Sequence, residues 1–253
     1  MDFRLQRANG WKRISALVLD GILLSILAVG IGSLLSWIFG YDALNTRLEE
    51  AYTRYETEYN VSFAITQEDY EAFTEAEKEN YDAAYAALIG DEEAMQVYRK
   101  ITSTTMLMVT FSLLAAFLIL DFAVPLLFGD GKTIGKWVFG LALVTPEGVK
   151  VRKVALFVRT ILGKFTLETM IPVYVLLMLF FGLVGLSGTI LLLGLLIVQL
   201  VMYFTSENRT VIHDRLAGTV VVDYASQKIF ATREEMLEAK KQAAAEKAAR
   251  QEW

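Results

Sequence analysis

The chain has no cysteine, one histidine and three prolines among its 253 residues. Without cysteine there is no disulfide framework, no thiol nucleophile and no thiolate metal site. A single histidine excludes a multi-histidine zinc site, and three prolines exclude Pro-rich docking segments. The net charge of −5 provides no broad basic surface for a phosphate backbone. We therefore expect no resident cofactor and no nucleic-acid partner.

Charged side chains are also scarce, at 21% of residues against 55% hydrophobic, and the mean hydropathy is +0.41. This composition is too apolar for a soluble domain of this length, which indicates the lipid bilayer as the solvent. The run 14–39 carries Asp20 as its only charge and is too long for the apolar core of a signal peptide. The run 101–128 again carries one charge, Asp121. Each run predicts one transmembrane helix.

Residues 171–205 form a stretch of 35 residues without a charged side chain. This length suits two crossings joined by a tight turn, which we place at Gly185-Leu186-Ser187-Gly188; one long tilted helix is the alternative. The four expected transmembrane helices then cover about 13–40, 92–128, 156–186 and 188–206.

Basic side chains near the helix ends predict the orientation of these helices. The arm before the first helix carries four of them: Arg4, Arg7, Lys12 and Arg13. Residues 42–100 hold five basic and fifteen acidic side chains, whereas residues 129–169 hold seven basic and three acidic ones. We expect a multi-pass protein of the plasma membrane with both termini in the cytoplasm and the acidic insertion outside.

The acidic insertion has its own helix signals. Thr66 and Thr74 each precede an acid by three residues, the pattern of a capping box, and Gly90 predicts a helix end. Aromatic side chains recur at helical spacing and form a stripe on each short helix. These stripes either pack on one another as a cap or form a surface for a partner protein or cation. A helix that starts at 91–93 should run unbroken into the second membrane span.

The segments after the second and fourth helices change to strand-like patterns. Residues 141–145 and 149–151 predict a hairpin, and residues 218–223 a third strand of the same small sheet. Residues 232–253 are rich in Glu, Lys and Ala and predict a solvated helix, with docking to another subunit as the alternative. The expected segments are 1–40, 41–100, 101–130, 131–162, 163–206, 207–230 and 231–253. Together they describe an all-α polytopic membrane protein with four transmembrane helices, an extracytoplasmic helical insertion and a small cytoplasmic β-sheet.

The glycine- and lysine-rich segment 129–136 superficially resembles a phosphate-binding loop. Such a loop needs a glycine five residues before its Gly-Lys pair and a hydroxyl after it. Gly135-Lys136 is followed by a tryptophan, and the position five residues before Gly131-Lys132 holds a leucine. The segment also follows a membrane span rather than a buried strand. We therefore reject nucleotide binding.

Four motifs in order give the chain a resemblance to the RDD family of prokaryotic membrane proteins, which is named for an arginine and two aspartates. They are Arg13-Ile14-Ser15-Ala16-Leu17-Val18-Leu19-Asp20; Gly131-Lys132-Thr133-Ile134-Gly135-Lys136 with Gly140; Arg159; and His213-Asp214-Arg215-Leu216-Ala217-Gly218-Thr219-Val220-Val221-Val222. By this resemblance Arg13 is the arginine and Asp20 the first aspartate, and Asp214 is our choice for the second. The acidic insertion and the charged tail lie outside the common core. The resemblance implies a transport role, in some members cation/proton exchange.

Carboxylates inside membrane helices also point to a site, because each costs about 2.5–3.5 kcal/mol to insert. Asp20 and Asp121 each lie about two turns from the same membrane face, so we expect them to approach within one side-chain pair's reach, directly or through a cation, water or arginine. If they face each other, one should hold a proton. The expected ion- or substrate-binding residues are Arg13, Asp20, Asp121, Arg159 and Asp214. A polar clamp that only fixes helix packing is the alternative.

Other polar residues near the helix ends have simpler interpretations. His213 and Asp214 should form a turn and cap after the last helix, with a gate or proton relay as the alternative. Lys164 and Glu168, one turn apart, should form an interfacial pair.

Three functions remain: a small transporter or antiporter, a non-transporting scaffold or accessory subunit, and an intramembrane enzyme. We do not expect an enzyme, because neither a serine–histidine pair nor an embedded metal set is apparent. The bilayer is the expected environment. A homo-oligomer, another membrane-protein partner and a monovalent cation stay open as partners.

Overall fold

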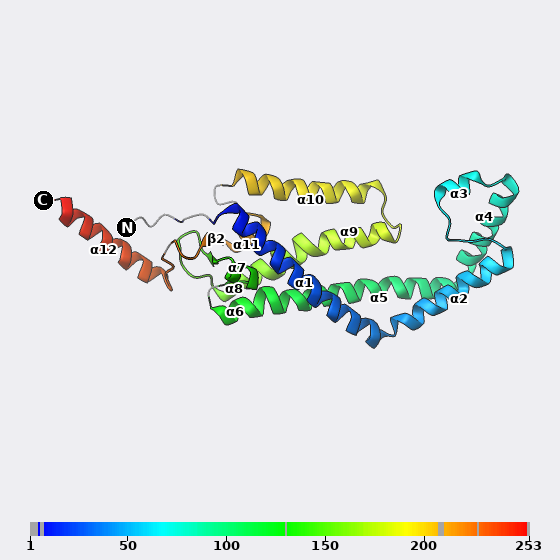
Figure 1. Ribbon diagram of the computed structural model, residues 1–253, viewed down its shortest axis with the longest axis horizontal. Helices are drawn as coiled ribbons and strands as arrows, with labels where there is room; N and C mark the ends of the chain where they lie inside the picture. Colours follow the sequence, from blue (N-terminus) through cyan, green and yellow to red (C-terminus); the bar gives the residue numbers. More distant parts are fainter. Residues whose placement is uncertain (1–4, 6–7, 130, 207–209, 227, 252–253) are drawn as a thin grey trace. The chain divides into compact units, whose positions relative to one another are not determined.

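A computed structural model describes residues 5, 8–129, 131–206, 210–226 and 228–251 (Figure 1). Arg4, Arg7 and Asp130 lie outside these residues. The described chain contains four helices that are long and apolar enough to cross a membrane, as predicted. It divides into two compact units, Met1–Ile31 with Thr110–Trp253, and Gly32–Val109. Each unit is described by itself.

The first two membrane helices lie close to their predicted bounds. The first is α1, Gly10–Phe39, and the second runs through α5 (Glu92–Phe117), the π-helical turn η1 (Leu118–Ala123) and α6 (Val124–Phe128). Pro125 has no N–H to donate to the carbonyl of Asp121, four residues earlier. The Thr160 hydroxyl donates to this carbonyl instead, at 3.0 Å. The irregular turn is thereby tied to the third membrane helix.

The third membrane helix begins earlier than predicted. It consists of α8 (Lys153–Phe157), the π-helix η2 (Val158–Met170) and α9 (Ile171–Phe180). Arg159 lies inside this helix, in η2, and is buried. The helix begins at Lys153, three residues before the predicted start at 156.

The turn before the fourth helix is also displaced from its predicted position. The chain turns over 181–185, where Gly182 has φ +68°, and α10 spans Leu186–Thr205. The single tilted helix is therefore wrong, and so is the turn at 185–188. Gly188 lies inside α10, where a Cβ would come within 3.2 Å of Val175. The glycine allows α9 and α10 to pack closely, and Figure 1 shows them side by side.

The small sheet has two strands rather than three. β1 (Leu141–Val144) pairs antiparallel with β2 (Val220–Asp223), and both are almost completely buried. Residues 149–151 contribute only isolated bridges, from Lys150 to Val144 and from Val149 to Phe230. The predicted hairpin is therefore reduced to its turn and one antiparallel bridge, and residues 220–223 form the long pairing with β1. Buried side chains of both strands, among them Val144, Val220 and Val222, form part of the core.

Three further helices complete this unit. α7 (Ile134–Val138) precedes β1, α11 (Ile212–Ala217) precedes β2, and α12 (Arg233–Gln251) confirms the predicted carboxy-terminal helix. α12 is not solvated throughout, because Met236 is buried against Val149 and Phe230.

The unit Gly32–Val109 contains the acidic insertion. Its helices are α2 (Tyr41–Tyr59), α3 (Gln67–Ala72) and α4 (Glu75–Gly90), and both predicted capping boxes are present. Rings from the helices gather around Phe63, which makes edge contacts with Tyr52, Tyr81 and Tyr85. The aromatic stripes therefore pack on one another. Asp91 caps the helix that continues into the second membrane span, as predicted.

Candidate functional site

The most buried ion pair joins the third membrane helix to α11. Nε and Nη2 of Arg159 donate to Oδ1 of Asp214 at 3.1 and 2.9 Å, and both side chains are about 97% or more buried. Nη2 of Arg13, on α1, lies 3.7 Å from the other oxygen, Oδ2. Burial alone would raise the pKa of Asp214, but the neighbouring groups, Arg159 foremost and Arg13 among them, together outweigh it and hold that pKa well below its usual range. Three of the five predicted site residues therefore meet here.

His213 lies beside this pair, inside α11. Its backbone N–H donates to Oε1 of Glu168 at 2.9 Å, and its Nδ1 lies 2.6 Å from Oε2. Arg159 has no acceptor, so its Nη2, 2.8 Å from His213 Nε2, must donate to that nitrogen. Nδ1 then carries the proton and the ring is neutral, which agrees with a pKa lowered by burial and by Arg159.

These contacts correct two predictions. His213 and Asp214 are not a loose turn and cap, because both are buried within α11 and bonded to the third membrane helix. Lys164 and Glu168 do not pair as an interfacial couple: Glu168 bonds His213, and Lys164 bonds Asp121. Lys164 is directed inward because Asp121 neutralises its charge, and Glu168 because it accepts hydrogen bonds from His213.

Asp20 is held by the segment after the second membrane helix. Its Oδ1 accepts from the backbone N–H of Gly135 at 2.7 Å, and its Oδ2 accepts from the Thr133 hydroxyl. A Cβ at Gly135 would come within 2.3 Å of the Ala16 carbonyl, so only glycine permits this approach of α7 to α1. Both donors to Asp20 are neutral groups.

Among the described residues, Asp20 and Asp121 have no direct partner in common. Asp121 bonds the ammonium of Lys164, and the described residues show no hydrogen bond between the two carboxylates. The proton expected on one of two facing carboxylates therefore has no geometric basis. Lys136 is a group that both carboxylates influence electrostatically.

Lys136 lies in the middle of α7 and is 93% buried. Its Nζ donates to the Thr133 hydroxyl at 3.2 Å, and that hydroxyl in turn donates to Asp20. Burial, together with the positive charges of Lys164 and Arg159, lowers the pKa of Lys136 to about 7, against the opposing influence of Asp20 and Asp121. A group that titrates near neutral pH therefore lies next to a membrane carboxylate.

The remaining motif residues shape the backbone around the site. Gly131 and Gly218 adopt φ of +63° and +59°, which favours glycine, and Gly218 ends α11. The Lys132 ammonium lies 3.2 Å from the centre of the Tyr224 ring. Thr219 bonds Asp214 through its backbone N–H, which donates to the Asp214 carbonyl at 2.9 Å. These residues position the charged groups.

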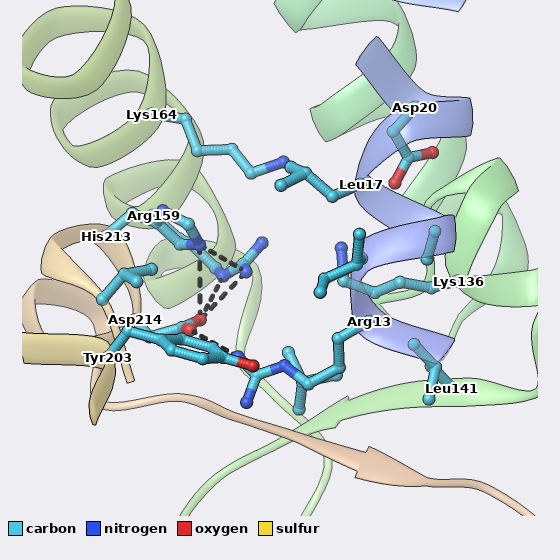
Figure 2. Close-up of a pocket in the computed structure, with 14 residues that line it drawn as sticks. Arg13, Leu17, Asp20, Lys136, Leu141, Arg159, Lys164, Tyr203, His213 and Asp214 are labelled. Carbon is cyan, nitrogen blue, oxygen red and sulfur yellow. Dashed lines mark hydrogen bonds and ion pairs between the residues drawn. The ribbon is translucent and has the colours of Figure 1, made fainter. Parts of the chain in front are cut away.

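A cavity of about 150 Å³ lies between these groups. Figure 2 shows Lys164, Arg159 and Asp214 on one side and Asp20, Lys136 and Arg13 on the other. Tyr203 and His213 also line it, whereas Asp121 does not. The apolar part of its wall consists of Ile14, Ala16, Leu17, Leu141, Val211 and Val221.

Sequence reasoning missed Lys164 and Tyr203 as site residues and named Lys136 only as part of a motif. The signal for Lys136 was a lysine close to a membrane span that no nucleotide-binding motif explains. Lys164 follows Arg159 by five residues, and both line the cavity. A π-helix, whose hydrogen bonds join residues five apart, brings this spacing to one side, whereas the sequence indicated a regular α-helix. Tyr203 carried no signal of its own.

The fold and this cavity define a helical, multi-pass class of membrane protein with a charged site between its helices. The model of the RDD family matches residues 7–218, so the chain belongs to the RDD family. No curated protein and no solved structure matches the chain.

Proposed function

We propose that this RDD-family protein transports a small ion or solute across the plasma membrane, coupled to protons, through the charged cavity. The observation that carries the proposal is the environment of Asp20. This carboxylate lies on a membrane helix, lines the cavity and accepts hydrogen bonds from two neutral groups, Thr133 and Gly135.

A carboxylate in this position needs a positive charge or a proton nearby, because its charge is costly in a medium of low dielectric constant. Lys136 supplies that charge only while it is protonated, and its pKa of about 7 means that it is partly neutral under ordinary conditions. A proton, or a cation that enters the cavity, would then neutralise Asp20 instead. This alternation is the physical basis for proton coupling.

The family resemblance implies cation/proton exchange in some members, and if this protein moves a cation, Asp20 is the exchanging carboxylate because either a proton or a cation neutralises it. Asp121, bonded to Lys164, helps by fixing one of the positive charges of the wall. The basic and acidic loops support an orientation with both termini in the cytoplasm. Labelling single cysteines introduced at Asn60 and Gly148 tests that orientation, and reaction of both from the same face of intact cells would contradict it.

Flux through the purified protein in liposomes tests the transport proposal. The vesicles enclose a pH-sensitive dye, and a gradient of Na⁺ or K⁺ is imposed. In the parent, protons should move in the direction opposite to the cation. Asp20→Asn keeps the shape of the side chain but removes its charge, and this variant should abolish the pH-dependent flux. Asp42→Asn, in the exposed first turn of α2, is the matched control and should behave like the parent. Equal flux in the parent and in Asp20→Asn would refute the role of Asp20.

A second function is favoured by the acidic insertion. This segment has an aromatic centre around Phe63 and two capping boxes, so it is organised well enough to present a binding surface. In this second function the protein is a scaffold or accessory subunit, and its buried charges only hold the helices together. A stoichiometric partner retained in detergent, lost on removal of residues 61–89 and accompanied by no flux, would favour it over transport.

A further inference from the structure

The cavity wall contains a buried acceptor that no described residue satisfies. Oδ2 of Asp214 has no hydrogen-bond partner within the described part of the chain, although the side chain is 99% buried. Arg13 is its nearest ion-pair partner, and at 3.7 Å the contact is too long for a hydrogen bond. A buried carboxylate oxygen of this kind indicates a hydrogen-bond donor other than the described side chains and backbone groups, such as a bound solute.

The same wall contains unused donors. An ammonium group has three N–H bonds. In the described contacts, Lys136 donates to one side-chain acceptor, Thr133, and Lys164 also donates to one, Asp121. The cavity therefore offers an open acceptor on α11 and open donors on α7 and η2. Figure 2 shows Lys136 across the cavity from Asp214.

The charges of the wall restrict what can bind. Four cationic side chains, Arg13, Lys136, Arg159 and Lys164, line the cavity with two carboxylates, Asp20 and Asp214. While Lys136 is protonated, a bare metal cation would meet four positive charges, and the described residues contain no group of three His, Cys, Asp or Glu side chains that could hold it. A simple anion would satisfy the lysines but would leave Oδ2 of Asp214 without a donor. A solute with both charges satisfies both sides.

We propose that the cavity binds a small zwitterion of the amino-acid type. Its ammonium group donates to Asp214 Oδ2, and its carboxylate accepts from Lys136 and Lys164. Its hydrocarbon part packs against the apolar wall, to which Leu17 and Val211 contribute. This inference rests on the proposed function, since it names the class of solute that the transporter would carry.

Titration calorimetry on the full chain in lipid nanodiscs tests the proposal, with glycine as the zwitterionic probe. Methylammonium chloride, sodium acetate and sodium chloride at equal ionic strength present one charge at a time. Glycine should bind at least about tenfold more tightly than any of them, because each probe of one charge loses a charge-assisted contact. Methylammonium, acetate or sodium binding as tightly as glycine would overturn the proposal.

Variants locate the binding. Lys136→Gln should weaken glycine binding about tenfold or more, since the amide keeps a donor for Thr133 but loses the charge. Leu17 lines the cavity and its side chain is largely exposed. Leu17→Trp changes no charge and should weaken glycine binding because the larger side chain narrows the cavity. Lys12→Gln, whose lysine pairs with Asp223 away from the cavity lining, is the matched control. Unchanged binding in a folded Leu17→Trp protein would overturn the proposal even if Lys136→Gln fails to fold.

The two proposals fail in different ways. Glycine binding that depends on the cavity, without any flux in liposomes, would support the zwitterion site and contradict transport. Proton-coupled flux of sodium or potassium without glycine binding would overturn the zwitterion site and leave transport standing.

Discussion

Replacing Lys136 by methionine should change how the stability of the protein depends on pH. The folded protein holds the pKa of Lys136 at about 7, whereas the unfolded chain returns it to about 10.5. Between these two values the unfolded chain binds more protons than the folded protein, so the folded state gains stability as pH rises. Below pH 7 Lys136 is protonated in both the folded and the unfolded state, so the cost of burying its charge reduces the stability of the folded protein in full.

The size of this effect follows from the pKa shift. Each unit corresponds to about 1.4 kcal/mol, so the lysine's contribution should change by ~3–5 kcal/mol between pH 7 and pH 10. Methionine has a similar length and no charge. Lys136→Met should therefore be more stable than the parent at pH 6.5, and this advantage should shrink steadily as the pH approaches 10.

Reversible denaturant titrations of the parent and Lys136→Met at pH values from 6.5 to 10 provide the assay. The difference between the two proteins cancels the titration of other groups. The matched control is Lys12→Met, which removes a lysine whose side chain is 45% exposed. A constant difference between the parent and Lys136→Met across pH 7–10 would refute the burial argument for Lys136.

Two further predictions concern packing. Gly135→Ala would place a methyl group 2.3 Å from the Ala16 carbonyl and should lower the free energy of unfolding by about 1–3 kcal/mol in denaturant titrations. The control Gly30→Ala, which has open space around it, should cause no loss of stability, and equal stabilities of the two variants would contradict the close approach. Arg159→Met should cost about 3–5 kcal/mol by leaving Asp214 buried without its main partner, and adding Asp214→Leu should recover much of that loss. A double variant less stable than the single one would contradict this account of the pair.

The sequence predicted the elements whose causes are local. Apolar runs marked the four membrane helices, because nothing else in the chain tolerates so long a stretch without charge. Thr66 and Thr74 marked two helix starts, because a capping box is complete within four residues. These features need no knowledge of distant parts of the chain.

The displaced boundaries have a physical reason. Charge marks the end of a membrane helix only when the charged group faces water. Arg159 and Lys164 are instead neutralised by Asp214 and Asp121, so the third helix continues through both of them. Within 171–205 no change of polarity marks the turn, so the sequence does not distinguish Gly182 from the glycines that follow it.

The sequence identified several residues of the candidate site, but it did not predict which of them are in contact. Arg13, Arg159 and Asp214 do meet, but Asp20 and Asp121 have separate partners. Contacts of this kind depend on how helices pack, and no spacing within one helix encodes them. The orphaned oxygen of Asp214, which motivates the zwitterion site, is visible only in three dimensions.

Proton-coupled flux in liposomes tests the central claim most directly. The measurement compares the parent, Asp20→Asn and Asp42→Asn, reconstituted at equal protein-to-lipid ratio, with glycine, Na⁺ and K⁺ offered separately. The account predicts a pH-dependent flux of one of these solutes in the parent and in Asp42→Asn, and its loss in a folded Asp20→Asn protein. Flux that is unchanged in Asp20→Asn, or absent from the folded parent with all three solutes, would contradict it.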